Sequence, residues 1–121
     1  MPRNVLDESR IHPAVRAKVS DGNTDIVREV EAAIAANPVL VVGMRQNPWP
    51  KHARRLLDAK HIQHKYLEYG SYLSGWRRRG ALKMWAGWPT FPMVFVKGVL
   101  VGGASDLARL EASGELAKML A

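Results

Sequence analysis

Strand and helix patterns alternate along this chain, and this order constrains the fold more than any other feature of the sequence. After Thr24 the apolar residues recur at three- and four-residue steps until Asn37-Pro38, which predicts a helix that ends there. Residues 39–42 then form a short, continuously apolar and β-branched run, typical of a strand buried on both faces. The regular structure is therefore expected to begin with a helix followed by a buried strand.

The alternation continues to the end of the chain. Residues 93–96 and 99–101 are apolar and flank Lys97-Gly98, which is typical of a hairpin with a glycine-containing turn. The other elements that we predict are a helix around residues 53–57, a strand over 62–69, a helix from Ser74 to about Ala86, and a final helix that Ser105 caps and Gly114 interrupts. Strands that alternate with helices before a terminal hairpin predict an α/β fold in which helices flank a mixed sheet.

The length of 121 residues, with 47% apolar and 24% charged residues, indicates one domain with one hydrophobic core. Residues 1–22 are polar and aperiodic, so we expect an N-terminal extension over 1–22 and a single domain over 23–121. No apolar run approaches the roughly 18 residues of a membrane-spanning helix, and residues 1–4 lack the apolar segment of a signal peptide. We therefore expect a cytoplasmic protein with no membrane partner.

The chain contains no cysteine. This excludes disulfides, thiolate zinc sites and iron–sulfur ligation by the protein's own thiolates. Thiol–disulfide exchange starts with attack by a thiolate, so the chain has no thiol–disulfide oxidoreductase activity of its own. His52, His61 and His64 have no clustered carboxylates beside them, and we expect no metal and no iron–sulfur cluster.

Positive charge is concentrated in the middle third of the chain. The formal net charge is +7, and residues 45–83 contain ten lysines and arginines against Asp58 and Glu68. Such a field favours an anionic partner, although a solvated basic surface that maintains solubility accounts for it equally well. The four tryptophans offer stacking platforms for nucleic acid, but we expect two or more of them to form the core or the walls of a groove.

Several segments resemble a known family. Trp-Pro-Thr-Phe-Pro at residues 88–92, followed by residues 94–98 and Val101-Gly102-Gly103, resembles the C-terminal half of glutaredoxins and is most similar to the monothiol branch. Residues 36–41 are similar to the first helix and strand of that branch, and the likeness covers roughly residues 24–121. The resemblance implies a thioredoxin-like (glutaredoxin) fold with a four-stranded mixed sheet.

The resemblance ends where glutaredoxins perform their chemistry. They carry Cys-Pro-Tyr-Cys or Cys-Gly-Phe-Ser between the first strand and the second helix, whereas this chain reads Asn47-Pro48-Trp49-Pro50. Asn47 stands at the position of the nucleophile and Pro50 at that of the resolving cysteine. A fold does not carry an activity with it, so we predict a natural, divergent member without disulfide-reducing activity.

The family's glutathione groove has counterparts in this chain. The resemblance implies a cis peptide before Pro92 and a backbone at Phe91 that pairs with the ligand's peptide unit. It also implies that the helix start at Gly103 faces a carboxylate and that Asp106 receives the α-amine, although Ser-Asp is an ordinary capping sequence too. The binding residues that we predict here are Phe91, Pro92, Gly103, Ala104, Ser105 and Asp106.

Two arginines complete the predicted groove. Arg79 lies nine residues before Trp88, where the monothiol branch has an arginine that holds the ligand's glycyl carboxylate through a two-pronged pair. Arg77 and Arg78 are equally available for this role. Arg45 substitutes for a lysine that the family carries near the nucleophile, since Met44 occupies the lysine's own position.

These features favour a non-catalytic module, linked to redox homeostasis, that binds glutathione or an anionic peptide. One alternative is a glutathione-dependent enzyme that uses the ligand's own thiol, oriented by Asn47. A second alternative is a basic adaptor that binds an acidic protein or, less favoured, nucleic acid through residues 77–79. We expect a monomer or a weak dimer.

Overall fold

The computed structural model describes residues 6–15, 24–71 and 73–121. Of the predicted extension over 1–22, residues 1–5 and 16–22 lie outside the described part. Within 6–15 a 3-10 turn, η1, spans Glu8–Arg10, and residues 13–15 are helical. In the described segments no helix has the length and hydropathy needed to cross a membrane.

The sheet has four strands in the order β2-β1-β3-β4. The strands are β1 (Val39–Gly43), β2 (Lys65–Glu68), β3 (Met93–Val96) and β4 (Val99–Gly102). The strand β1 pairs in parallel with β2 and antiparallel with β3, which pairs antiparallel with β4. The sheet is therefore mixed, as the sequence predicts.

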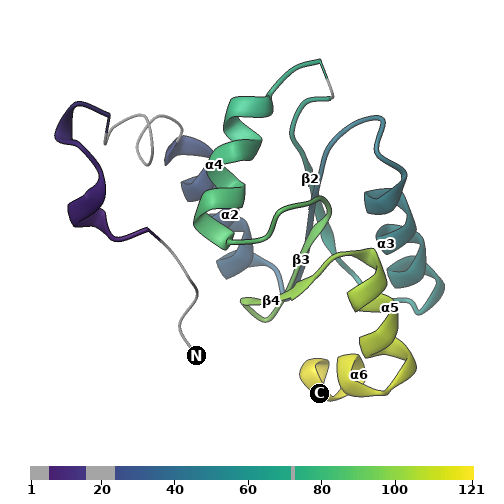
Figure 1. The fold of residues 1–121 in the computed structure, drawn as a ribbon. Coiled ribbons are helices and arrows are strands. Elements are labelled where there is room, and N and C mark those ends of the chain that lie inside the picture. Colours follow the sequence, from purple (N-terminus) through teal and green to yellow (C-terminus); the bar gives the residue numbers. More distant parts are fainter. Residues whose placement is uncertain (1–5, 16–23, 72) are drawn as a thin grey trace.

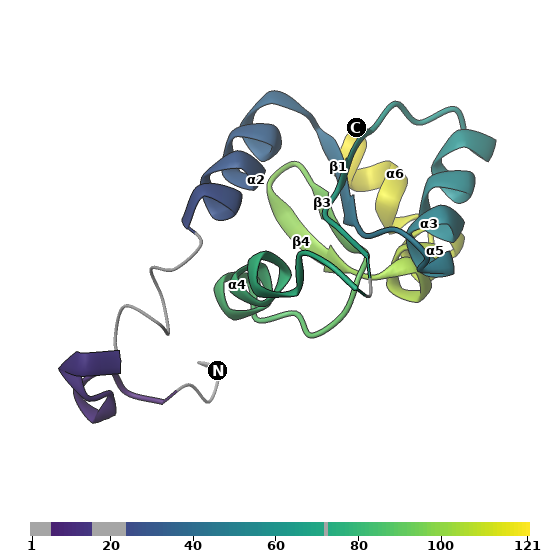
Figure 2. The same cartoon turned by 90° about the horizontal axis from the view of Figure 1, so that it is seen from above.

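Helices cover both faces of this sheet. They are α2 (Thr24–Ala36), α3 (Pro48–Ala59), α4 (Trp76–Ala86), α5 (Ala104–Ala112) and α6 (Glu115–Leu120). Figures 1 and 2 show α2 and α4 on one side of the sheet and α3, α5 and α6 on the other. This three-layer arrangement is the thioredoxin-like fold that the resemblance implies.

The strand β1 lies at the centre of the core. All five of its residues are buried, which confirms the prediction of a strand buried on both faces. Leu40 and Val42 pack in the cluster that contains Ile26 of α2 and Leu82 of α4. Val39 and Val41 pack in a second cluster with residues of α3, α5 and α6, among them Ala53, Leu57, Leu107 and Leu116. Successive side chains of a strand point to opposite faces of the sheet, so β1 contributes side chains to both clusters.

The second strand is shorter than predicted. The sequence predicts a strand over 62–69, but β2 begins at Lys65. The Ile62 N–H donates to the Leu57 carbonyl at 2.9 Å, so the chain is still completing the end of α3 at this point. His61 has a φ of +57°, which reverses the chain before the strand begins.

Two predicted helix caps are wrong by one or two residues. Ser74 and Ser71 exchange backbone hydrogen bonds in a turn, and Gly75 is the N-cap of α4. Gly103, and not Ser105, is the N-cap of the last helix, because the Asp106 carboxylate reaches back to the Gly103 N–H. The predicted interruption at Gly114 is confirmed, since Gly114 separates α5 from α6.

Candidate functional site

A pocket of about 220 Å³ lies where the N-termini of α3 and α5 meet the turn that precedes β3. We call it the groove. Its lining residues are Trp49, Trp88, Thr90, Phe91, Pro92, Gly103, Ala104, Ser105 and Asp106. The structure therefore brings together six of the eight residues that the sequence assigned to ligand binding, and their binding role remains a prediction. Two of the four tryptophans, Trp49 and Trp88, form walls.

The turn before β3 contributes a backbone edge to the groove. The Phe91-Pro92 peptide is cis, as predicted. Within the described residues no group accepts a hydrogen bond from the Phe91 N–H, whereas the Phe91 carbonyl accepts one from Asn47 Nδ2 at 3.3 Å. A carbonyl oxygen has two lone pairs, so this oxygen can accept a second bond. A ligand can therefore accept a hydrogen bond from the Phe91 N–H, and it can donate one to the Phe91 carbonyl, which already accepts one from Asn47.

Asn47 joins α3 to the turn before β3. Its Oδ1 accepts a hydrogen bond from the Trp49 N–H at 3.0 Å and caps α3, while its Nδ2 donates to the Phe91 carbonyl. The sequence predicts that Asn47 occupies the nucleophile's position but does not predict this link. An asparagine followed by proline at a helix start is an N-cap signal, which was available in the sequence. Both ends of its amide are engaged within the protein, which weighs against the hypothesis that Asn47 orients a ligand thiol.

The start of α5 forms the opposite wall. The N–H groups of its first turn have no acceptor within the helix and carry partial positive charge. Asp106 Oδ2 accepts from the Gly103 N–H at 3.0 Å, which holds the turn in place and leaves the other carboxylate oxygen for a cation. Gly102 has a φ of +106°, and a Cβ there would lie 2.6 Å from Asp106 Oδ2. This wall therefore depends on a glycine.

Trp88 supplies a donor that sequence analysis did not identify. Its indole Nε1 is buried, and within the described segments it has no hydrogen-bond partner. Leaving a buried donor unpaired costs about 1–3 kcal/mol, so this indole favours an acceptor that can reach it. Trp49, on the α3 side, is 53% exposed and presents an apolar surface at the groove's mouth.

The two predicted arginines do not line the groove. Arg79 is buried, and its Nη1 donates to the carbonyls of Tyr69 and Ser74 at 3.0 and 2.6 Å. It closes the loop between β2 and α4 from the inside. Arg45 is exposed, with its Nε 3.7 Å from Glu68 Oε2. The sequence could not distinguish an arginine that binds carbonyls of its own loop from one that binds a ligand carboxylate.

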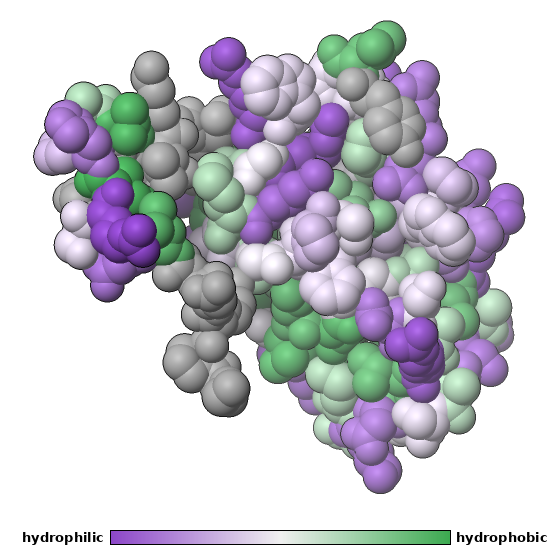
Figure 3. Space-filling model, viewed as in Figure 1, coloured by the Kyte–Doolittle hydropathy of each residue, from purple (hydrophilic) through white to green (hydrophobic). Residues whose placement is uncertain are grey.

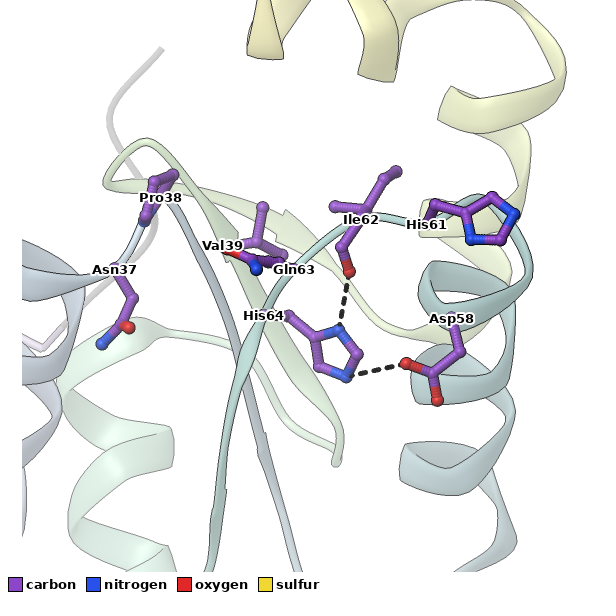
Figure 4. A pocket seen from close by; sticks show the side chains of 8 residues that line it. All are labelled: Asn37, Pro38, Val39, Asp58, His61, Ile62, Gln63 and His64. Carbon is purple, nitrogen blue, oxygen red and sulfur yellow. Dashed lines mark hydrogen bonds and ion pairs between the residues drawn. The ribbon is translucent and has the colours of Figure 1, made fainter.

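A larger hollow of about 670 Å³ lies at the opposite end of β1 (Figure 4). There His64 Nδ1 lies 3.0 Å from the Ile62 carbonyl, and its Nε2 lies 4.0 Å from Asp58 Oδ1. The His61 ring points away from them in Figure 4. In the part of the chain that the structure describes, no group of three or more potential ligands could hold a metal ion. The groove is the better candidate site despite its smaller volume, because the residues that line it carry donors with no acceptor among the residues that the structure describes.

Comparison with known proteins places the chain in a family. The fold and groove define a module of the glutaredoxin type. No family model matches the chain. However, "Glutaredoxin-like protein" of Dictyostelium discoideum is 46% identical over 88 residues, which are 73% of this chain and 72% of that protein. The chain belongs to the glutaredoxin family, as a divergent member without cysteine.

Two further proteins show the breadth of the likeness. "Monothiol glutaredoxin-S15, mitochondrial" of Arabidopsis thaliana is 28% identical over 85% of this chain and 63% of its own length. The crystal structure of a buckwheat glutaredoxin–glutathione complex has a TM-score of 0.71, with 23% identity over 80% of this chain and 88% of that one. Because the identity to the buckwheat protein is only 23%, this similarity shows that the fold is shared and nothing further.

Proposed function

We propose that this chain is a glutaredoxin-like module that binds glutathione, or a related γ-glutamyl or anionic peptide, without a covalent step of its own. One observation carries the proposal. Residues that line the groove carry N–H donors for which no acceptor lies within the described part of the chain, namely the buried Trp88 Nε1 and the Phe91 N–H, and the first turn of α5 adds N–H groups that have no acceptor within the helix. A small peptide with several carbonyl and carboxylate oxygens matches such a set of donors.

The walls suggest how such a peptide is oriented. Its γ-glutamyl carboxylate would face the positive end of α5, with its α-amine toward the free oxygen of Asp106. Its middle peptide unit would pair with the Phe91 backbone. The ligand's sulfur then lies on the α3 side, where the chain offers Asn47 and Trp49 and no thiol. Support for glutathione itself comes from the buckwheat glutaredoxin, whose structure contains that peptide.

The absence of a nucleophile determines what this module does. Glutathione would be held as an intact peptide, because no protein thiol is present to exchange with its sulfur. We propose accordingly that the module serves redox homeostasis in the cytoplasm as a binding protein rather than as a reductase. Turnover of a disulfide or an electrophile by the pure protein with glutathione would favour the alternative, an enzyme that uses the ligand's thiol.

Titration of isotope-labelled protein with reduced glutathione, followed by two-dimensional amide NMR, tests the proposal. We expect saturable shifts at Phe91, Gly103, Ala104 and Ser105, and a similar pattern with S-methylglutathione, since the thiol is not required. The dipeptide Cys-Gly, which lacks the γ-glutamyl end, is expected to bind far more weakly. The absence of saturable shifts at millimolar glutathione overturns the proposal.

A pair of matched substitutions locates the site. Ala104→Glu places a carboxylate at the start of α5 inside the groove, where it repels an anionic ligand. Ala112→Glu places the same charge at the exposed end of the same helix, away from the groove. We expect the first variant to lose glutathione binding about tenfold or more, as for removal of one well-placed charged contact, and the second to bind normally.

A further inference from the structure

The outward side of α4 is unusual for a helix on a small domain. Trp76, Gly80 and Met84 are spaced four residues apart and so lie on one side of the helix. Trp76 is 64% and Met84 58% exposed, while Leu82 on the opposite side is buried. We call this side, with the neighbouring Arg77 and Lys83, the α4 outer face. In Figure 3, which is viewed as in Figure 1, the surface over α4 is mixed, with hydrophilic groups beside pale and light-green ones.

Gly80 at the middle of this face packs against no other part of the described domain. A Cβ built at this position meets no atom of the described residues within 4 Å. Glycine is among the poorest helix formers, and its φ is not in the left-handed region that would require it. A glycine between two large exposed side chains leaves a depression in which another backbone can approach closely.

The charge on the face is positive but small. Arg79 is buried against carbonyls of its own loop. Arg78 lies 3.1 Å from Asp25 and 3.9 Å from Glu29 of α2, so its charge is paired. Arg77, whose guanidinium lies 5.1 Å from the centre of the Trp76 ring, and Lys83 supply the remaining charge, and α4 contains no acidic residue.

A hollow of about 310 Å³ lies at the C-terminal end of the face. Its lining residues are Lys83, Met84, Gly87, Trp88 and Pro89. Apolar surface therefore surrounds a single ammonium group, which suits an apolar side chain with a carboxylate close by. Trp88 also lines the groove, so this hollow and the groove share a wall.

We infer that the α4 outer face docks an amphipathic, acidic segment of another protein. Its apolar side chains pack on Trp76 and Met84 and in the hollow, its backbone approaches at Gly80, and its carboxylates pair with Arg77 and Lys83. Nucleic acid fits less well, because two cations, for which the described residues offer no ion-pair partner, make few phosphate contacts and the face carries one exposed ring rather than a row of stacking platforms. Of the arginine run at residues 77–79, the surface thus presents only part of the charge, and apolar side chains surround it.

The test uses a helical peptide with leucines at three- and four-residue steps and glutamates on its flanks. We expect saturable amide shifts on α4 and around the hollow, and no binding of the same peptide with lysines in place of glutamates. The double variant Trp76→Ser with Met84→Ser is expected to lose binding about tenfold or more, as truncated interface anchors do. Val99→Ser, which removes an equally exposed apolar side chain from β4, is the matched control and is expected to bind normally.

Three outcomes overturn the inference. They are the absence of saturable shifts with the acidic peptide, shifts that persist in the double variant, and binding of oligothymidylate at this face in place of the peptide. The Ala104→Glu variant separates this inference from the proposed function, because it blocks the groove and leaves the α4 outer face intact. Peptide binding is expected to survive in that variant even where glutathione binding is lost.

Discussion

The two walls of the groove use their polar groups in opposite ways. On the α3 side, Asn47 engages both ends of its amide within the protein, and Pro50 is buried. A Cβ at Gly43 would lie 2.7 Å from the Pro50 Cβ, so this wall is packed from behind as well. On the α5 side, no acceptor within the helix engages the first-turn N–H groups, and one oxygen of Asp106 has no hydrogen-bond donor among the described residues.

The difference shows which part of a site survives the loss of its reactive group. The resemblance to glutaredoxins implies that reactive cysteines occupy this wall in other members of the family, whereas here Asn47 caps α3 and Pro50 is buried. The α5 wall and the turn at Phe91 present backbone N–H groups, and on the α5 side Gly102 and the Asp106 carboxylate hold that backbone in place. A binding function that depends on backbone donors can therefore outlast the cysteines.

The largest expected effect comes from a substitution in the α5 wall. Gly102→Ala forces a side chain into a left-handed φ of +106° and against the Asp106 carboxylate. We expect the free energy of unfolding to fall by about 1–3 kcal/mol, together with loss of glutathione binding, because the α5 start is displaced. Urea denaturation and the glutathione titration measure the two effects. Full binding by a destabilised variant would show that the α5 start does not hold the ligand.

A substitution in the α3 wall is expected to lower stability without loss of glutathione binding. Asn47→Ala removes the N-cap of α3 and the bond to the Phe91 carbonyl, and we expect it to lower the free energy of unfolding by about 1–2 kcal/mol. Glutathione binding is expected to persist, since the Phe91 carbonyl becomes fully available. Asn47→Asp, which can still cap the helix, is the control that isolates the bond to Phe91. Loss of binding in both variants would contradict the contrast between the walls.

The sequence predicts the parts of this molecule that depend on local pattern. Helix α2, the buried strand β1, the hairpin and the break at Gly114 follow from apolar periodicity and turn residues. The resemblance to glutaredoxins predicts the cis peptide at Phe91-Pro92 and the six residues that the groove brings together.

The parts that were not predicted depend on contacts across the chain. In the sequence, Arg79 cannot be distinguished from the neighbouring Arg77 and Arg78. Only the folded loop shows that Arg79 donates to the Tyr69 and Ser74 carbonyls. The same holds for Arg78, whose partners belong to α2. The unpaired indole of Trp88 is likewise a property of its surroundings. Charge counted along a sequence therefore overstates the charge that a surface presents.

A smaller effect of opposite sign is expected outside both walls. Gly80→Ala adds a methyl group in open space on a helix, and we expect it to raise the free energy of unfolding by about 0.5–1 kcal/mol. Glutathione binding is expected to remain unchanged. Thermal denaturation checks the sign, and a destabilised Gly80→Ala variant would show that the glycine has a function within the domain itself.

The last effect appears only at alkaline pH and concerns the packing behind the α3 wall, where Tyr66 lies. Its hydroxyl donates to Glu68 Oε1 at 3.0 Å and would lie 2.9 Å from a Cβ at Gly43. Burial, and then the hydrogen bond to Glu68, raise the pKa of Tyr66 to about 12, whereas an unfolded tyrosine titrates near 10. The folded protein holds this proton more tightly, so the stability that Tyr66 contributes is fully present below pH of about 10 and is lost as the pH rises toward about 12.

Tyr69 acts in the same direction, since burial and its hydrogen bond to Glu29 raise its pKa as well. Urea midpoints measured across this alkaline range are therefore expected to fall with pH, and Tyr66→Phe is expected to flatten part of the fall. Tyr69→Phe is the matched control, because it removes the corresponding group from the α2 and α4 side of the sheet. A second outcome is that only the Tyr69 variant flattens the fall of the urea midpoint with pH. Ionisation of Tyr66 would then not loosen the α3 wall, whose rigidity would come from Asn47 and Pro50.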